Sequence, residues 1–441
     1  MGLHYNEISA KKKKAFNNIA WALCGKIFSL MSVLVAGIIV ARYLGKEQYG
    51  IMNYVISYIA IFQVFADFGL DLIQIREESQ KPDERDKIIG TVWGLRLFFA
   101  LCTLIVIAST TFLFVKETEI QTYILIYAIS IILNTTWVSR NHFTSIVWNE
   151  YVVKTEISRS LISIIIKVIL VFFHFPLVWF IYSLLIDSLL LATGYTISYS
   201  KKIDSIRKWR FDKHLAYYML QQSFPLLLSS TAIIIYNRID QIMIGNMIDQ
   251  SHLGVYSVAV RFVELLVFVP TIISQTISPM LVEIRTKDIN QYENVSRTFL
   301  NITVTICIIL AIVTSLLSYP LIYFTFGKVY IEAVPILAIL SFKVVGDALS
   351  QTSGQLIIIE GMQKYAPIRN IIGCITCVTL NLLFLSHYGI RGVAIVAIIT
   401  IFISGTLANL LIPSYRFIFN KQMLAIVLGW KDIVHIKSLL K

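Results

Sequence analysis

Long uninterrupted apolar runs alternate with short polar segments along this chain of 441 residues. The longest run without a charged residue covers 298–327, and further charge-free runs cover 392–415 and 97–115. A helix needs about 20 apolar residues to cross the hydrocarbon core of a bilayer. The runs are continuous rather than alternating, which favours membrane helices over the strands of a membrane barrel. The pattern therefore predicts an all-α polytopic membrane protein.

We place about twelve transmembrane spans in these runs. The predicted spans are 17–41, 50–69, 90–114, 121–139, 157–173, 177–199, 223–245, 254–278, 299–324, 333–356, 367–386 and 389–413. Spans five and six are separated only by the tripeptide HFP at 174–176. Because proline disfavours helix at the residue before it, we expect a tight outer turn there.

Lysine and arginine are distributed unevenly between alternate loops. With the N-terminus placed inside, the inner loops and tails hold twenty-seven of the 38 Lys and Arg residues, and the outer loops hold five. Positively charged loops tend to stay on the cytoplasmic side. We therefore expect a multi-pass protein of the bacterial inner membrane with both termini in the cytoplasm. The segment 416–441 has a partial apolar face and is expected to form an amphipathic helix on the inner surface.

The longest basic loop follows the sixth span and divides the chain near its middle. We expect an N-terminal lobe at 1–200, a cytoplasmic basic linker at 201–222, a C-terminal lobe at 223–413 and a cytoplasmic tail at 414–441. An internal repeat supports two six-helix lobes, because a Glu, Lys and Arg at 150, 154 and 159 recur 210 residues later. Gly50 and Gly254 likewise each open the second span of a lobe. Such repeats favour a binding cavity between the lobes, near the middle of the bilayer.

Ten charged residues lie well inside the predicted spans, where a charge costs on the order of several kcal/mol unless it has a partner or water. The six cations are Lys26, Arg96, Lys167, Arg238, Arg261 and Lys343. The four acids are Asp187, Asp240, Glu264 and Asp347, with Asp67 and Asp71 near an inner end.

Two pairs of these residues have the spacing of local ion pairs. Arg261 and Glu264 are three positions apart, and Lys343 and Asp347 are four apart. Residues at both spacings share a helix face. One interpretation of the charges is therefore structural ion pairing between packed helices.

Other charges have no such partner. Arg238 and Asp240 are two apart and point to different faces, while Lys26 and Arg96 have no acid three or four positions away within their own spans. These cations need another helix or a wet cavity, so the second interpretation is a water-filled passage with a positive wall.

The second interpretation assigns roles to ten residues. The candidate cavity cations are Lys26, Arg96, Lys167, Arg238 and Arg261. The candidate cation-orienting or ion-coupling residues are Asp240, Glu264, Lys343 and Asp347. Pro270 lies in the middle of a span and is a candidate hinge, because proline removes a helix hydrogen bond. Pro225 and Pro279 suit ordinary helix ends. No metal and no cofactor are expected, apart from a coupling H⁺ or Na⁺.

Three motifs of the chain are ARYLGKEQYG at 41–50, NRIDQIMIG at 237–245 and LGVYSVA at 253–259. They resemble those of Wzx-type flippases of the polysaccharide transporter family, in the MOP (multidrug/oligosaccharidyl-lipid/polysaccharide) superfamily, and the resemblance covers about 15–415. It implies a V-shaped, two-lobed fold. The implied cargo is an undecaprenyl-diphosphate-linked oligosaccharide, an O-antigen or capsule repeat unit, moved to the outer leaflet by alternating access. The implied partners are membrane lipid and the polymerase and chain-length regulator of lipopolysaccharide or polysaccharide biosynthesis.

The chain lacks the sequence features expected of an enzyme. It has no P-loop, zinc-ligand cluster or serine elbow, and its predicted loops are short. The net charge of +12 collects in loops, so no nucleic-acid partner is expected. The alternatives are a cation-coupled multidrug exporter of the same superfamily and a lipid-linked peptidoglycan-precursor flippase. The excess of cations in the spans favours an anionic cargo, but the motifs do not name the sugar.

Overall fold

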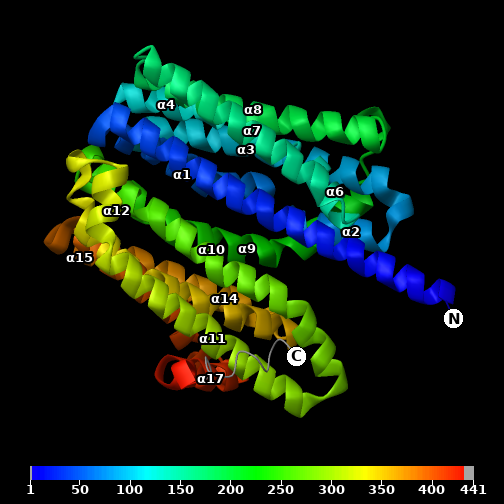
Figure 1. Cartoon of the computed structure of the whole chain (residues 1–441). Helices are drawn as coiled ribbons and strands as arrows, with labels where there is room; N and C mark the ends of the chain where they lie inside the picture. Colours follow the sequence, from blue (N-terminus) through cyan, green and yellow to red (C-terminus); the bar gives the residue numbers. More distant parts are fainter. Residues whose placement is uncertain (1, 432–441) are drawn as a thin grey trace. The chain divides into compact units, whose positions relative to one another are not determined.

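The computed structural model describes residues 2–431, with side chains from residue 25 onward, and this part of the chain is helical without a strand (Figure 1). Packing divides the chain into two units. Unit 1 comprises Met1–Leu44 and Val55–Ser230, and unit 2 comprises Gly45–Tyr54 and Thr231–Lys441. The predicted all-α membrane fold is confirmed. The units differ from the predicted lobes, because residues 45–54 pack with unit 2 and the linker packs with unit 1.

Unit 1 is built from seven complete α-helices, parts of two more and two short 3₁₀ turns, joined by brief connections. It shares its first and last helices with unit 2. Its elements are α1 (Gly2–Asp67), α2 (Leu70–Gln80), η1 (Pro82–Glu84), α3 (Arg85–Phe114), α4 (Thr118–Ala128), α5 (Ser130–Asn134), α6 (Trp137–Ser145), α7 (Asn149–Phe172), α8 (Leu177–Lys202), η2 (Ile206–Lys208) and the first part of α9 (Lys213–Met247). α7 and α8 form a hairpin around the predicted turn at 174–176.

Unit 2 contains the rest of α9 and the helices that follow it. These are α10 (Gln250–Lys287), α11 (Ile289–Leu316), α12 (Ser318–Thr325), η3 (Lys328–Tyr330), α13 (Ala333–Leu340), α14 (Lys343–Ile359), η4 (Gln363–Tyr365), α15 (Ala366–Phe402), the π-helical turn η5 (Ile403–Leu407), α16 (Ala408–Leu411), η6 (Pro413–Tyr415) and α17 (Arg416–Leu428).

Nine helical stretches of the described residues are long and apolar enough to cross a membrane. Two of them contain a glycine in the left-handed region, Gly45 at φ 74° and Gly389 at φ 55°, where two helices meet at a kink. Glycine adopts this conformation without the steric penalty of a Cβ atom. Dividing both stretches there turns nine into eleven, and α7, a further helix of 24 residues, lies at the predicted fifth span.

Several predicted boundaries are wrong because helices continue through them. α9 begins at Lys213 rather than 223, so part of the predicted linker is helical. Pro225 lies inside α9 and Pro279 inside α10, so neither marks a helix end. Membrane helices tolerate proline because neighbouring groups satisfy the freed backbone carbonyl. Pro270 also lies inside α10, and its role as a hinge stays a prediction.

Loops that the charge pattern places on the same side contact each other within each unit. In unit 2, Lys46 and Glu332, from two predicted outer loops, form an ion pair at 2.9 Å. Two predicted inner segments of unit 2 are joined by Lys421 and Glu293 at 2.6 Å. The up-and-down order of the spans therefore agrees with the structure, while the side that faces the cytoplasm stays a prediction.

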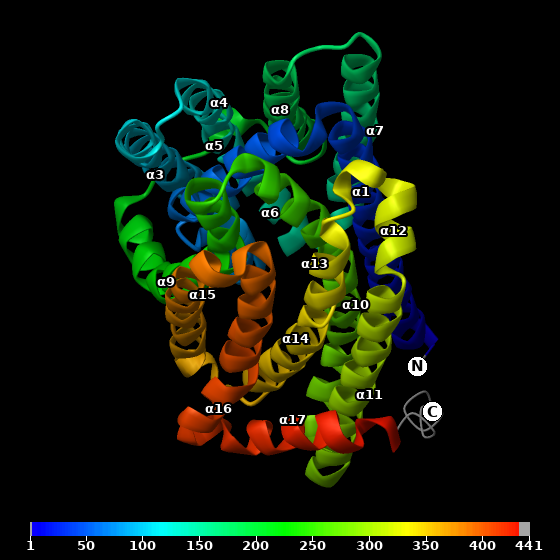
Figure 2. The same ribbon diagram turned by 90° about the vertical axis from the view of Figure 1, so that its left-hand side faces the viewer.

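The predicted C-terminal amphipathic helix corresponds in part to α17. Figure 2 shows α17 running across α11, and its buried side chains Ile418 and Ala425 belong to the same apolar core as α11. The buried Gln422 instead donates to the carbonyls of Leu349 and Gly405. The rest of the predicted helix, including Ile433 and Val434, lies outside the described residues.

The basic linker is docked on the start of α3 rather than loose. The N–H of Arg210 donates to the carbonyl of Asp86 at 3.1 Å, and the N–H of Asp212 donates to Oγ1 of Thr91 at 3.1 Å. The ammonium of Lys87 lies 3.0 Å from the Asp212 carboxylate. A Cβ atom on Gly90 would fall under 3.0 Å from the backbone of Arg210, so glycine permits the close approach.

Acidification is expected to release this docked linker. Hydrogen bonds from the N–H of Leu215 and from Lys87 hold the pKa of Asp212 below its ordinary value of 3.8. A lowered carboxyl pKa contributes stability above the ordinary value, and that stability is lost as the pH falls through the lowered pKa. Docking should thus persist at neutral pH, and Asp212→Asn should weaken it there. Trypsin should then cut after Arg207 and Lys208 several-fold faster than in the parent protein.

The control for this experiment is Asp83→Asn, which changes an exposed carboxylate on the neighbouring η1 turn. It should leave the rate of tryptic cleavage unchanged. Equal cleavage of Asp212→Asn and the parent would show that the Asp212 carboxylate does not hold the linker.

Candidate functional site

Two arginines of unit 2 share one glutamate. Nη2 of Arg238, on α9, lies 3.1 Å from Oε1 of Glu264, on α10. Nη1 of Arg261 lies 3.2 Å from Oε2 of the same carboxylate. The other terminal nitrogen of Arg261 donates to Oδ1 of Asn53 at 3.1 Å. The local pairing of Arg261 with Glu264 is therefore present, and Arg238 joins it from a second helix.

The local sequence explains how these side chains come to face one another. α10 begins after Asp249, whose carboxylate accepts a hydrogen bond from the N–H of His252 at 2.7 Å and caps the helix. From that start, the three-residue spacing places Arg261 and Glu264 on one face of α10.

Lys343 takes a different partner from the one that its spacing suggests. Its Nζ donates to Oδ1 of Asn237 on α9 at 3.1 Å, and within residues 25–431 it forms no ion pair with Asp347. In the described part of the chain, Lys343 and Asp347 thus form no close ion pair, because the lysine side chain reaches across to α9, but the two charges still interact electrostatically. Oδ2 of Asp347 is buried without a hydrogen-bond partner in the described structure. Lys343 also lies close enough to Glu264 to interact with it electrostatically.

Asp240 is buried and is held by neutral donors rather than by Arg238. The hydroxyl of Tyr256 donates to Oδ2 of Asp240 at 2.5 Å, and the N–H of Gln241 donates to Oδ1 at 2.7 Å. This agrees with the expectation that Arg238 and Asp240 point to different faces. Among the described residues, Arg238 therefore forms its ion pair with Glu264 and not with Asp240.

We call Arg238, Arg261 and Lys343, together with Glu264, the unit 2 cation cluster. Among the described residues, its two arginines contact a single carboxylate, that of Glu264, and Lys343 contacts the amide oxygen of Asn237 instead. The side chains of Arg238, Arg261 and Glu264 are 26%, 16% and 34% exposed, so the cluster is neither dry nor fully solvated. Guanidinium groups offer paired N–H donors that match the oxygens of phosphate or carboxylate. The cluster therefore offers donors of the kind that anions accept from.

The three candidate cations of unit 1 have other surroundings. Lys26 is exposed and forms no ion pair with residues 25–431. Arg96 is fully buried and pairs with Asp67 at 3.4 Å and with Asp71. These contacts of Arg96 match the alternative interpretation, ion pairing between packed helices.

Lys167 is also paired. Its Nζ lies 2.9 Å from Oδ2 of Asp187 on the neighbouring α8, and it donates to Ser163 one helical turn away. The partners of Lys167 and Arg96 come from other helices, so local spacing did not identify them. A cavity role for Lys26, Arg96 and Lys167 stays a prediction.

The neutral polar residues that contact the cluster were not predicted, because a pattern of charges does not single them out. Asn53 accepts a hydrogen bond from Arg261, and Asn237 accepts one from Lys343. Tyr256 donates to the neighbouring Asp240. Asn237 and Tyr256 stand within the two motifs at 237–245 and 253–259, and that position was the one available signal.

The chain matches the family model described as polysaccharide biosynthesis protein over residues 39–335. No curated protein matches the sequence. Several solved structures have a similar fold at low sequence identity. One is a multidrug resistance MATE family transporter of the MOP superfamily in an inward-facing conformation, with 16% identity, a TM-score of 0.67, and coverage of 93% of this chain and 95% of that one.

A second similar structure is the lipid II flippase MurJ, with 17% identity, a TM-score of 0.64, and coverage of 95% of this chain and 93% of that one. A third is a MOP superfamily transporter from Pyrococcus furiosus, whose binding pocket is described as having reverse polarity. It has 15% identity, a TM-score of 0.60, and coverage of 98% of this chain and 97% of that one. These similarities establish the fold that the chain shares with MOP transporters.

Proposed function

Given that the chain belongs to the polysaccharide biosynthesis protein family, we propose that it is a flippase for an undecaprenyl-diphosphate-linked oligosaccharide. Its cargo is an O-antigen or capsule repeat unit, which it moves from the cytoplasmic to the outer leaflet of the bacterial inner membrane. The family match and the fold shared with MOP transporters support a membrane flippase. The diphosphate cargo is the finer part of the proposal.

The observation that carries the diphosphate is the single carboxylate shared by Arg238 and Arg261. A polyprenyl diphosphate must pass a region where an unpaired charge is unfavourable by on the order of several kcal/mol. Two partly exposed guanidinium groups with one carboxylate between them leave an excess positive charge for this anion. Glu264 then orients both arginines, and Lys343 adds a further ammonium group beside them.

The rest of the cargo makes different demands on the protein. The polyprenyl tail stays in lipid because it is apolar, whereas the glycan needs water and hydrogen bonds along its path. Alternating access would supply that path, with Pro270 as the hinge. Asp240 and Asp347 are the candidate groups for a coupling H⁺ or Na⁺. The polymerase and the chain-length regulator of the same pathway would act on the product.

The two alternatives differ in how well the cation cluster suits them. A cation-coupled multidrug exporter would need acids for a cationic drug, and the cluster has the opposite sign. A lipid-linked peptidoglycan precursor on a polyprenyl diphosphate presents the same anion as the proposed cargo. The choice between the two lipid-linked cargoes therefore depends on the glycan.

The proposed function is tested by deleting the gene from its host and locating the lipid-linked repeat units. We expect them to accumulate in the cytoplasmic leaflet, with loss of surface polysaccharide and recovery when the chain is restored. Normal surface polysaccharide after deletion would refute the proposal. Sensitivity to cationic drugs without a polysaccharide defect would instead favour the multidrug exporter.

A further inference from the structure

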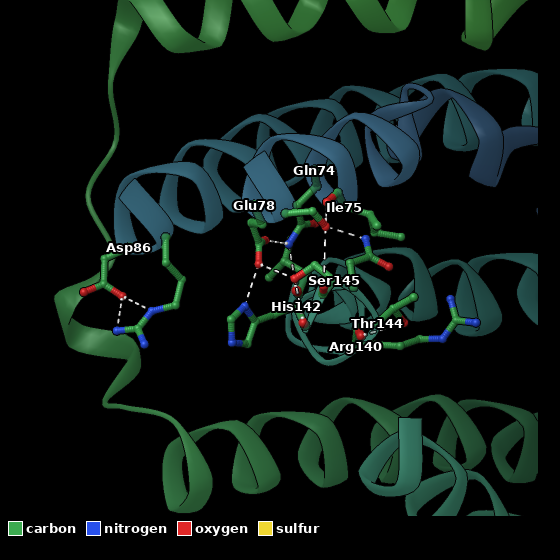
Figure 3. A network of polar contacts seen from close by, with 12 residues as sticks. Gln74, Ile75, Glu78, Asp86, Arg140, His142, Thr144 and Ser145 are labelled. Atoms are coloured by element: carbon green, nitrogen blue, oxygen red, sulfur yellow. Dashed lines mark hydrogen bonds and ion pairs between the residues drawn. The ribbon is translucent and has the colours of Figure 1, made fainter. Parts of the chain in front are cut away.

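A buried histidine–glutamate pair lies in unit 1 and takes no part in the unit 2 cation cluster. Nδ1 of His142, on α6, is 2.5 Å from Oε2 of Glu78, on α2, and the two side chains are 5% and 2% exposed. Oγ of Ser145 donates to the same carboxylate oxygen at 3.2 Å, and Nε2 of Gln74 donates to the other at 2.6 Å. Figure 3 shows these four side chains between the ribbons of α2 and α6. They form a closed polar contact between two helices.

The pair is the end of a longer hydrogen-bonded chain. Oε1 of Gln74 accepts from Nδ2 of Asn141 at 3.0 Å, and the same amide nitrogen donates to Asp71 at 2.6 Å. Asp71 is paired with Arg96 on α3. The histidine and the buried arginine are thus connected through two amide side chains.

The chain continues beyond Arg96 to the end of α1. Arg96 also contacts Asp67 at 3.4 Å, and Asp67 accepts from Nε2 of Gln63 at 2.9 Å. Oε1 of Gln63 accepts from Asn134 at 2.9 Å. One continuous set of contacts therefore joins α1, α2, α3, α5 and α6.

This network contains more carboxylates than permanent cations. It contains three carboxylates, those of Asp67, Asp71 and Glu78, against one guanidinium. Asp67 and Asp71 are 24% and 35% exposed and share Arg96, whereas Glu78 is buried and has only His142 as an ion-pair partner in the described structure. A buried carboxylate without a counter-charge is strongly unfavourable. The Glu78 carboxylate therefore depends on His142 for its counter-charge within the part of the chain that the structure describes.

The surroundings of α6 supply no other cation in contact with Glu78 among the residues that the structure describes. α6 packs against α2, α3, α7 and α8. The charged or titratable groups of α6 and of these helices around the pair are Arg140 on α6, Asp71, Arg76, Glu77 and Lys81 on α2, Arg85, Asp86, Lys87 and Arg96 on α3, Tyr151, Glu156 and Arg159 on α7, and Tyr195 and Tyr199 on α8. In the described structure, the ion pairs of Arg76, Lys81, Arg85 and Lys87 go to Glu77, Asp86, Asp204 and Asp212 rather than to Glu78. Arg140 pairs with Glu156, and the ring of Tyr199 lies edge-on to His142 at 5.4 Å.

Backbone strain lies next to both ends of the network. Phe68 has φ 48° and follows Asp67 directly, and Gly69 has φ 67° at the start of α2. Val147 has φ 60° and stands two residues after Ser145, between α6 and α7. A β-branched residue is a genuine outlier in this region. Such strain persists where the surrounding structure holds it, and it is released when that support weakens.

We propose that His142 and Glu78 form a proton-binding latch that holds α2 against α6. With the proton bound, the imidazolium and the carboxylate attract each other, and the two strained turns are held closed. Loss of the proton to water leaves a buried carboxylate beside a neutral imidazole, so α2 and α6 separate more often. Histidine suits this role because its charge ordinarily changes between about pH 5 and 8. Control of cargo movement by the latch rests on the proposed function. The existence of the latch does not depend on that function.

The latch is tested by hydrogen exchange of the full chain in lipid nanodiscs at about pH 6 and about pH 8, corrected for the intrinsic pH dependence of exchange. Peptides from α2 and α6 should open about tenfold more at the higher pH, because hydrogen bonds to charged groups contribute on that scale. His142→Gln should raise opening at both pH values and remove the pH dependence. Glu78→Gln should also remove the pH dependence, because the variant has no carboxylate at this position that could lose its counter-charge.

The matched control is His252→Gln. His252 also contacts an acid, Asp249, at 2.8 Å, but both side chains are nearly half exposed. This variant should keep the parent's pH response in α2 and α6. A pH response that is absent in the parent, or that survives in both His142→Gln and Glu78→Gln, would overturn the latch. If His142→Gln does not fold, Glu78→Gln decides the matter.

A parallel assay of the same proteins in liposomes measures movement of lipid-linked repeat units. If the latch sets the rate, transport by the parent changes with pH and transport by Glu78→Gln does not. Absence of transport in the parent, with the exchange response intact, would refute the proposed function and leave the latch standing. Transport with the same pH dependence in the parent and in Glu78→Gln would refute the control of transport by the latch.

Discussion

Replacing Gly254 with valine should leave little folded protein in the membrane. Gly254 and Gly50, both in unit 2, lie where two helices meet backbone to backbone. A Cβ atom on Gly254 would fall under 3.0 Å from the carbonyl oxygen of Lys46, and one on Gly50 would meet the carbonyl oxygen of Gln250 as closely. A carbonyl group of the main chain cannot swing aside as a side chain can, so the helices must separate.

The expected loss is large compared with the stability of a typical protein. Overpacking a core costs about 1–3 kcal/mol and more where the backbone has to move, and a native domain has only about 5–15 kcal/mol in total. The fraction of detergent-extracted protein that elutes as a monodisperse peak, and its thermal unfolding midpoint, measure the effect. Gly50→Val should behave in the same way as Gly254→Val.

The control is Gly354→Ala, since Gly354 also lies inside a helix, α14, but has no neighbour within 4 Å of an added Cβ. Alanine is the better helix former, so this variant should be neutral or slightly stabilising. Normal amounts of folded Gly254→Val protein would contradict the tight backbone contact.

Replacing both Arg238 and Arg261 with alanine should reduce translocation of the lipid-linked cargo by about a hundredfold or more. Each charge-assisted hydrogen bond to an anion is worth about 1.5–3 kcal/mol, and about 1.4 kcal/mol corresponds to a factor of ten. Removing both guanidinium groups deletes two such hydrogen bonds, which accounts for at least this reduction. The measurement is the initial rate of cargo movement in liposomes, with surface polysaccharide in cells as a second readout.

The single variants separate binding from folding. Arg238→Ala leaves Arg261 paired with Glu264, so it should remain folded and lose part of the rate. Lys46→Ala is the matched control, because it removes a cation from an ion pair with Glu332 in the same unit without touching the cluster. It should translocate cargo at the parent's rate. Normal surface polysaccharide at normal protein levels in Arg238→Ala, Arg261→Ala and Lys26→Ala alike would refute the cationic binding site.

The helical spans follow from the sequence because hydropathy is a local property. A segment of about 20 apolar residues is long enough to span a bilayer whatever its neighbours do, so twelve spans could be placed without a structure. The contact of Arg261 with Glu264 is local in the same sense, because a three-residue spacing on a helix brings two side chains together. The family resemblance also rested on contiguous motifs, and the family model matches residues 39–335.

Contacts between helices could not be predicted from local spacing. Lys343 has an acid at the favourable spacing, Asp347, yet it donates to Asn237 on another helix. Arg96 has no acid nearby on its own helix, yet two carboxylates from α1 and α2 pair with it. Such partners depend on how far each helix is rotated about its axis and on which faces pack, and no local spacing encodes either.

The sequence by itself thus determined the class of protein, the number and order of its membrane helices, and the kinds of charge that they carry. The tertiary structure alone decided that Arg238 and Arg261 share Glu264, that His142 meets Glu78, and that the basic linker docks on α3. The physical reason is the range of the interactions. Burial of apolar residues acts along each segment separately, whereas an ion pair between helices exists only once packing has brought both side chains within about 4 Å.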